Sequence, residues 1–76
     1  MEDMLRLLQE VLPKVDFNND KSLVDNGTLD SLDIISIISE LSSEYDIEIP
    51  AEEITPENFN SAEAIYTLVE KLLEED

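Results

Sequence analysis

The stretch DSLDIISIISELSSEY, residues 30–45, predicts the strongest helix of the chain. Its apolar residues recur every three or four positions, as they do on one face of a helix, and they are Ile34, Ile37, Ile38, Leu41 and Tyr45. Asp30 is a favourable N-cap, and Asp33 places an acid near the positive end of the helix dipole. Because isoleucine has only moderate helix propensity, we expect packing of this face to stabilise the helix.

The residues before this stretch predict one helix and one long loop. Residues 2–12 form a helical pattern that Pro13 should end, with apolar positions at Met4, Leu7, Leu8, Val11 and Leu12. Residues 13–30 are expected to be a loop whose apolar anchors are Val15, Phe17, Leu23, Val24 and Leu29. A loop of this length in a small domain is usually functional or packed by its own side chains.

The residues after Tyr45 predict a connector and a very short helix. Residues 46–50 alternate as a strand does, but the sequence offers no partner strand. We therefore expect an extended connector that buries Ile47 and Ile49. The Thr-Pro pair at positions 55–56 predicts the first turn of a short helix that reaches Phe59.

A last helix should follow directly. Asn60 is predicted to be its N-cap, Glu63 occupies the capping-box position, and the helix should end at about Leu73. Its expected buried stripe is Ala64, Ile65, Leu68, Val69 and Leu72. These elements together predict an all-α fold, a small four-helix bundle of three main helices and one short helix, with the long loop between the first and second helices.

Chain length and net charge restrict the number of domains and the classes of partner. The chain has 76 residues, 42% of them hydrophobic, so residues 1–76 should form a single domain. Its 20 acidic and 4 basic residues give a net charge of −16, which disfavours nucleic acid and anionic membranes and favours proteins with basic patches. The N-terminus is unlike a signal peptide, and no apolar run approaches the roughly 20 residues that span a bilayer. We expect a cytoplasmic monomer without membrane insertion.

The residue types argue against an enzyme. The chain has no His and no Cys, so neither a Ser–His nor a Cys–His nucleophile can form. Its single glycine, Gly27, does not allow a glycine-rich phosphate loop. Asp16, Asn18 and Asp20 alternate like the start of a calcium loop, but Lys21 stands where that loop requires glycine. We expect no catalytic residue and no metal site.

Two aliphatic residues of the main helix are left outside its apolar face. At about 100° per residue, Leu32 and Ile35 point away from that face and lie beside serines at positions 36, 39, 42 and 43. An exposed apolar patch next to Ser31 is typical of a docking surface. Single surface aliphatics are also common without any function, so geometry leaves both interpretations open.

The motif GTLDSLD, residues 27–33, resembles the Asp-Ser-Leu attachment motif of the acyl carrier protein family. The resemblance covers nearly the whole chain, including the first helix, the long loop, the Ile-x-Ile-Pro connector and the short third helix. It implies that Ser31 receives a 4′-phosphopantetheine arm from coenzyme A through a phosphopantetheinyl transferase. The chain would then be a freestanding carrier.

The same resemblance implies roles for the neighbours of that serine. Asp30 and Asp33 would help to recruit the transferase and its metal ion, and Leu32 and Ile35 would make apolar contacts with partner enzymes. The thiol of the arm would hold an acyl or aminoacyl group as a thioester. Loading and condensing enzymes of fatty-acid, polyketide or related synthesis, with basic patches, are the implied partners.

The second helix departs from typical fatty-acid carriers, in which it is more acidic. Here four serines occupy much of its exposed surface, and the Thr28-Leu29 pair resembles specialised carriers, including those for D-alanine and for aminoacyl or polyketide cargo. The sequence therefore leaves the cargo open. An unmodified acidic protein-interaction module is the alternative from a different functional class.

Overall fold

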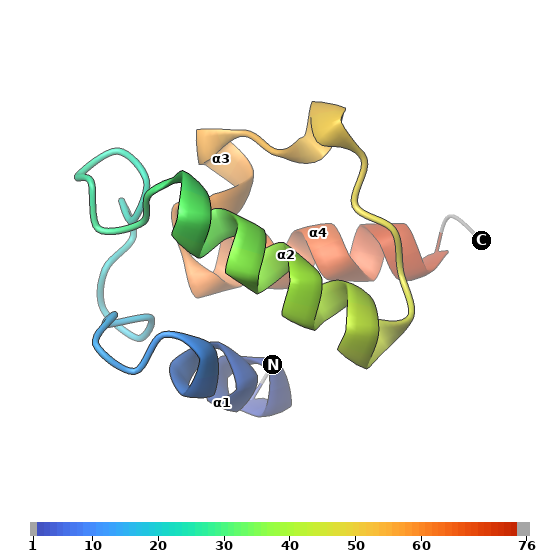
Figure 1. Cartoon of the computed structure of the whole chain (residues 1–76), viewed down its shortest axis with the longest axis horizontal. Helices are drawn as coiled ribbons and strands as arrows, with labels where there is room; N and C mark the ends of the chain where they lie inside the picture. Colours follow the sequence, from blue (N-terminus) through green and yellow to red (C-terminus); the bar gives the residue numbers. More distant parts are fainter. Residues whose placement is uncertain (1, 75–76) are drawn as a thin grey trace.

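A computed structural model describes residues 2–74 and confirms the all-α bundle (Figure 1). In this part of the chain there are three main helices, α1 (Glu2–Val11), α2 (Ser31–Tyr45) and α4 (Ala62–Glu74), and one short α-helix, α3 (Pro56–Phe59). A single 3-10 turn, η1 (Ala51–Glu53), precedes α3 and was not predicted. The described residues contain no β-strand, and residues 47–50 form a connector as expected.

The predicted long loop is present between α1 and α2, from residue 12 to residue 30. Figure 1 shows it at the end of the bundle where α2 begins. Four of its apolar anchors are buried, namely Val15, Phe17, Leu23 and Leu29, while Val24 is half-buried. The loop is therefore packed by its own side chains, as the sequence suggested, and it delivers the chain to the start of α2.

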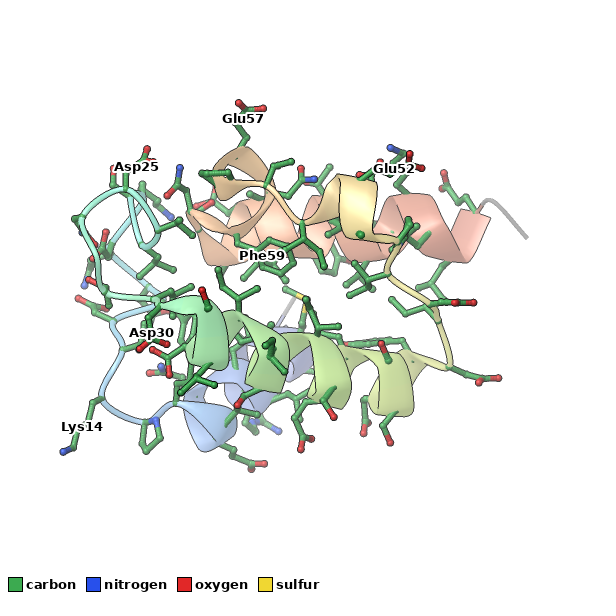
Figure 2. All side chains as sticks on the ribbon, turned by 45° about the horizontal axis from the view of Figure 1, so that its top comes forward. Lys14, Asp25, Asp30, Glu52, Glu57 and Phe59 are labelled. Carbon is green, nitrogen blue, oxygen red and sulfur yellow. The ribbon has the colours of Figure 1, made fainter. Side chains whose placement is uncertain are left out.

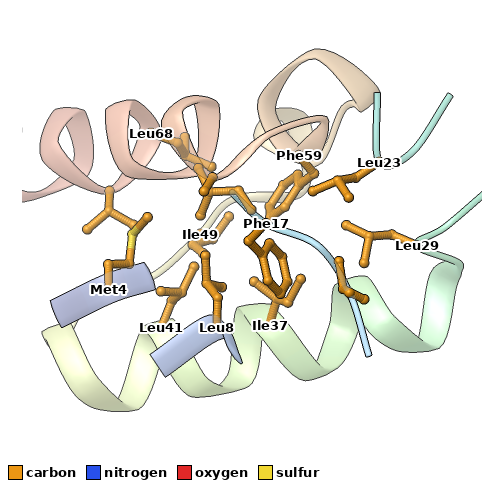
Figure 3. Close-up of a cluster of buried hydrophobic side chains, with 14 residues drawn as sticks. Met4, Leu8, Phe17, Leu23, Leu29, Ile37, Leu41, Ile49, Phe59 and Leu68 are labelled. Carbon is orange, nitrogen blue, oxygen red and sulfur yellow. The ribbon is translucent and has the colours of Figure 1, made fainter. Parts of the chain in front are cut away.

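One hydrophobic core joins the helices and the loop (Figure 3). Its buried residues are Met4, Leu8, Val15, Phe17, Leu23, Leu29, Ile37, Leu41, Ile49, Phe59, Ala62, Ile65, Leu68 and Val69. Half-buried residues at its edge include Ile34, Ile38, Tyr45, Ile47 and Leu72. The isoleucine-rich face of α2 thus packs on this core, which explains why a segment of moderate helix propensity is helical.

The prediction for the start of the last helix is wrong. Ser61, not Asn60, is the N-cap of α4, because the Ala64 N–H donates to the Ser61 hydroxyl oxygen at 3.0 Å. The cap therefore lies one residue later than expected, which moves Glu63 out of the capping-box position. It also places Ala62 in the core and leaves Ala64 only half-buried.

Candidate functional site

Ser31 is the first residue of α2, and it is exposed. Asp30 precedes it as the N-cap with an extended backbone (φ −102°, ψ −176°), so the helix begins abruptly at the serine. The Ser31 hydroxyl makes no hydrogen bond within residues 2–74. The first N–H groups of a helix have no partner within it and carry partial positive charge. The hydroxyl is therefore accessible at a helix end that favours an anion.

Asp30 and Asp33 fix this helix start by reciprocal hydrogen bonds. The Asp33 N–H donates to Oδ1 of Asp30 at 2.9 Å, and the Asp30 N–H donates to Oδ2 of Asp33 at 3.4 Å. The sequence predicted the cap and the position of the second acid, but not the returning bond. Figure 2 shows Asp30 at the end of α2 that faces the long loop. Both carboxylates thus lie at the helix end that carries Ser31.

A polar network holds the part of the loop that precedes the site. The Thr28 hydroxyl donates to Oδ1 of Asn26 at 2.7 Å, and Nδ2 of Asn26 donates to Oδ2 of Asp20 at 2.8 Å. The Ser22 N–H donates to Oδ1 of Asp20 at 2.9 Å. The hydrogen bonds that the Asp20 carboxylate accepts, above all from the Asn26 side chain and then from the Ser22 N–H, lower the pKa of Asp20. Gly27 completes the turn with a φ of +82°, which glycine adopts without strain.

The alternating acids of the loop serve as hydrogen-bond acceptors for their own turns. Asp16 accepts from the Asn19 N–H at 3.2 Å, as Asp20 does from its neighbours. Residues 2–74 contain no group of three or more His, Cys, Asp or Glu side chains arranged to hold a metal ion. The calcium-loop pattern is therefore explained by turn formation.

Asn60 ties this loop to the junction of α3 and α4, which the sequence analysis missed. Its Oδ1 accepts from the N–H groups of Val24 at 2.9 Å and Asp25 at 3.1 Å. Its Nδ2 donates to Oδ2 of Asp25 at 3.0 Å, and its carbonyl accepts from the Leu23 N–H at 2.9 Å. These partners lie 35 or more residues away in sequence, so only an asparagine at a helix boundary signalled the role.

An exposed apolar patch lies beside the serine. Leu32 and Ile35 have 73% and 60% of their surface accessible, so their predicted exposure is confirmed. Ile35 is one turn after Ser31 and shares its side of the helix. The start of α2 therefore combines a free hydroxyl, two carboxylates and an apolar surface.

This arrangement fits a phosphodiester on the serine. An exposed hydroxyl at a helix N-terminus can carry a phosphate group close to free N–H donors. Asp30 and Asp33 would repel the phosphate, but each uses one carboxylate oxygen in the capping bonds. The Ser31 side chain is exposed, so a group attached to it would project towards solvent.

A family model for the phosphopantetheine attachment site matches residues 2–70 of the chain. The chain belongs to the phosphopantetheine-binding carrier protein family. A phosphopantetheine attachment site is therefore present, and the resemblance inferred from residues 27–33 is confirmed. Carrier proteins of this family are not catalytic, and a carrier domain implies both a modifying transferase and partner enzymes.

The chain is similar to aminoacyl and D-alanyl carrier proteins. It is 36% identical over 63 residues to aminoacyl carrier protein 1 of Bradyrhizobium diazoefficiens, covering 83% of this chain and 69% of the relative. It is 33% identical over 73 residues to the D-alanyl carrier protein of Streptococcus suis, covering 95% and 92%. No solved structure matches the chain significantly. Within residues 2–74, no helix has the length and hydropathy to cross a membrane.

Proposed function

We propose that this protein is an aminoacyl carrier and that Ser31 bears its 4′-phosphopantetheine arm. The observation that carries the proposal is the exposed Ser31 hydroxyl at the first position of α2. The arm supplies a terminal thiol that holds the cargo as a thioester. The names of the relatives favour an aminoacyl group, D-alanine among them, over the fatty-acid and polyketide cargoes that the sequence also allows.

The positions of the other serines support Ser31 as the attachment residue. Ser61 also precedes a helix, but its hydroxyl accepts the N–H of Ala64. Ser22 lies within the long loop, away from any helix start. Ser36, Ser39, Ser42 and Ser43 lie inside α2, where the backbone N–H groups are already bonded within the helix. Ser31 differs from all of these in combining exposure with a helix N-terminus.

The surroundings of Ser31 give the proposed partner surface. Asp30 and Asp33 would attract the transferase and its metal ion, and Leu32 and Ile35 would make the apolar contacts. A net charge of −16 accelerates encounter with basic protein surfaces at low salt. The cytoplasmic location and the monomeric state remain predictions from the sequence.

Intact mass spectrometry tests the attachment residue. Incubation with a broad-specificity phosphopantetheinyl transferase, coenzyme A and magnesium should transfer one phosphopantetheinyl group to the Ser31 oxygen and release adenosine bisphosphate. Ser31→Ala should stay unmodified, and Ser43→Ala, an exposed serine at the far end of α2, should react like the wild type. Modification of Ser31→Ala, or failure of the wild type with several transferases, would overturn the assignment.

The cargo requires a second measurement. The mass of the protein purified from its native host should exceed the holo mass by one aminoacyl group, and hydroxylamine should remove that group because it cleaves thioesters. A fatty-acyl or polyketide mass would contradict the aminoacyl proposal. Partner binding that is unchanged by Ser31→Ala, with no modification in the host, would favour the acidic interaction module.

A further inference from the structure

A groove of about 590 Å³ runs between α1 and α2. Leu7, Glu10 and Val11 of α1 line one side, and Ile35 and Glu40 of α2 line the other. Ser36 and Ser39 also face it, and their short side chains leave the space between the helices unfilled. The groove thus includes the exposed Ile35 and extends from it along α2 to Glu40.

The groove offers apolar surface that the core does not cover completely. Leu7 and Val11 are one turn apart on α1 and are only half-buried. Across from them, Ile35 has 60% of its surface exposed. An apolar side chain from another molecule could therefore contact both helices at once and bury part of this surface.

The groove also carries negative charge from both helices. Glu10 and Glu40 are exposed and belong to its lining. The ion pairs between described residues join Lys21 to Glu63 and Lys71 to Glu53, so neither groove acid has a cation partner within residues 2–74. On a chain with a net charge of −16, such facing carboxylates attract a cation from outside.

We propose that this groove docks a positively charged amphipathic segment of a partner protein. An apolar side chain of the segment would rest on Leu7, Val11 and Ile35, and flanking Arg or Lys side chains would meet Glu10 and Glu40. A second copy of this chain does not fit, because it brings the same net charge of −16. The proposal rests on the carrier function for the existence of partner enzymes, and it is independent of which residue is modified.

The occupied groove would extend the partner surface beyond α2. Ile35 belongs both to the groove and to the patch beside Ser31, so a partner seated there would contact α1 while remaining next to the start of α2. Partner recognition would then depend on how α1 packs against α2 as well as on the residues that follow Ser31. A dependence of partner binding on α1 residues would distinguish docking in the groove from docking on the Leu32 and Ile35 patch alone.

Titration of the full nitrogen-15-labelled chain with a synthetic peptide tests the proposal by NMR. The peptide is helical, has blocked ends, and presents leucines on one face flanked by arginines; a second peptide replaces each arginine with glutamate. We expect amide shift changes centred on Leu7, Val11 and Ser39 with the arginine peptide, and none with the glutamate peptide. Glu10→Gln/Glu40→Gln should weaken binding about tenfold, as expected for loss of two exposed ion pairs.

Glu52→Gln/Glu57→Gln is the matched control. It removes the same charge from exposed glutamates on the opposite side of the molecule (Figure 2), and it should weaken binding less than about twofold, as distant exposed charges are screened. Ile35→Gln should also weaken binding. Its thermal unfolding should match that of the wild type, because Ile35 has 60% of its surface exposed, and the weaker binding is then assigned to the lost contact. Equal weakening in both double variants, or shift changes outside the groove, would overturn the proposal. Such a failure would leave the Ser31 mass test unaffected.

Discussion

The Asp30 N–H donates to the carboxylate of Asp33, and the Asp33 N–H donates to the carboxylate of Asp30. Ser31 lies between these two residues in sequence and takes no part in the exchange. Its hydroxyl is therefore held at the start of α2 without being used by the fold. Asp30 and Asp33 thus stabilise the helix start, and the Ser31 hydroxyl is left for modification. Substitutions at Asp30 test the stabilising role.

Asp30→Ala should lower the free energy of unfolding by about 1 kcal/mol, the usual cost of removing an N-cap side chain. The reason is that the Asp33 N–H loses its acceptor and the first turn of α2 frays. Urea denaturation measures the change. Because fraying also displaces Ser31, the rate of phosphopantetheinylation should fall in the same variant.

Asp30→Asn is the control, since it removes the same charge but keeps an oxygen that can accept the hydrogen bond. Its stability should lie within a few tenths of a kcal/mol of the wild type. Slow modification of this stable variant would assign the effect to the lost charge and support recruitment of the transferase by Asp30. Equal stability of the Ala and Asn variants would contradict the capping role.

A second prediction concerns Asn60, which joins the long loop to the junction of α3 and α4. Asn60→Ala removes the acceptor for the Val24 and Asp25 N–H groups. We expect a loss of about 1–2 kcal/mol in unfolding free energy, because water satisfies these groups only in part. Hydrogen exchange at both amides should become faster.

Asn18→Ala is the comparison for this change, because Asn18 is exposed in the same loop. It should leave the unfolding free energy within about 0.5 kcal/mol of the wild type. If Asn60→Ala exchanges no faster than Asn18→Ala at Val24 and Asp25, the loop is not held by the Asn60 side chain.

The N-caps of α2 and α4 show where local sequence was sufficient and where it was not. The Asp30 cap and the buried Ile37 and Leu41 depend on residues within about one turn, so periodicity and capping rules predicted them. Asn60 and Ser61 are both good caps, and local rules gave no reason to prefer the second. The choice depends on loop residues far away in sequence, which occupy the Asn60 side chain and leave capping to Ser61.

The groove between α1 and α2 was beyond sequence analysis for a similar reason. Leu7 and Val11 read as ordinary core positions of α1, and Ile35 as part of an isolated patch on α2. Only the packing of the two helices brings these residues and Glu10 and Glu40 to one surface. The net charge of −16 predicted that partners would be basic, but it did not predict where on the surface a basic partner would bind.

A third prediction follows from the lowered pKa of Asp20. Its folded-state pKa lies below the ordinary value of 3.8 because Asn26 and Ser22 donate to the carboxylate. The stabilisation of the folded protein by the ionised Asp20 carboxylate is therefore fully present above the unfolded-state pKa of Asp20. It is lost as pH falls through the folded-state pKa. The difference in unfolding free energy between wild type and Asp20→Ala should be constant above about pH 5 and shrink at lower pH.

NMR titration of the Asp20 carboxyl carbon checks the cause directly. Its midpoint should lie below 3.8 in the wild type and move back towards that value in Asn26→Ala, which removes the hydrogen bond that lowers this pKa most. A wild-type midpoint at or above 3.8 would show that the network does not favour the ionised form.

The last prediction concerns the apolar patch beside Ser31. Leu32→Gln and Ile35→Gln keep good helix propensity and change only exposed side chains, so stability should stay within about 0.5 kcal/mol of the wild type. If these side chains contact the transferase, each substitution should raise its KM for the carrier by up to about tenfold, the equivalent of one aliphatic side chain losing burial. Leu73→Gln, at an aliphatic of 47% exposure near the end of α4, should leave KM unchanged. A comparable rise in all three variants would mean that general surface hydrophobicity, and not the position next to Ser31, determines recognition.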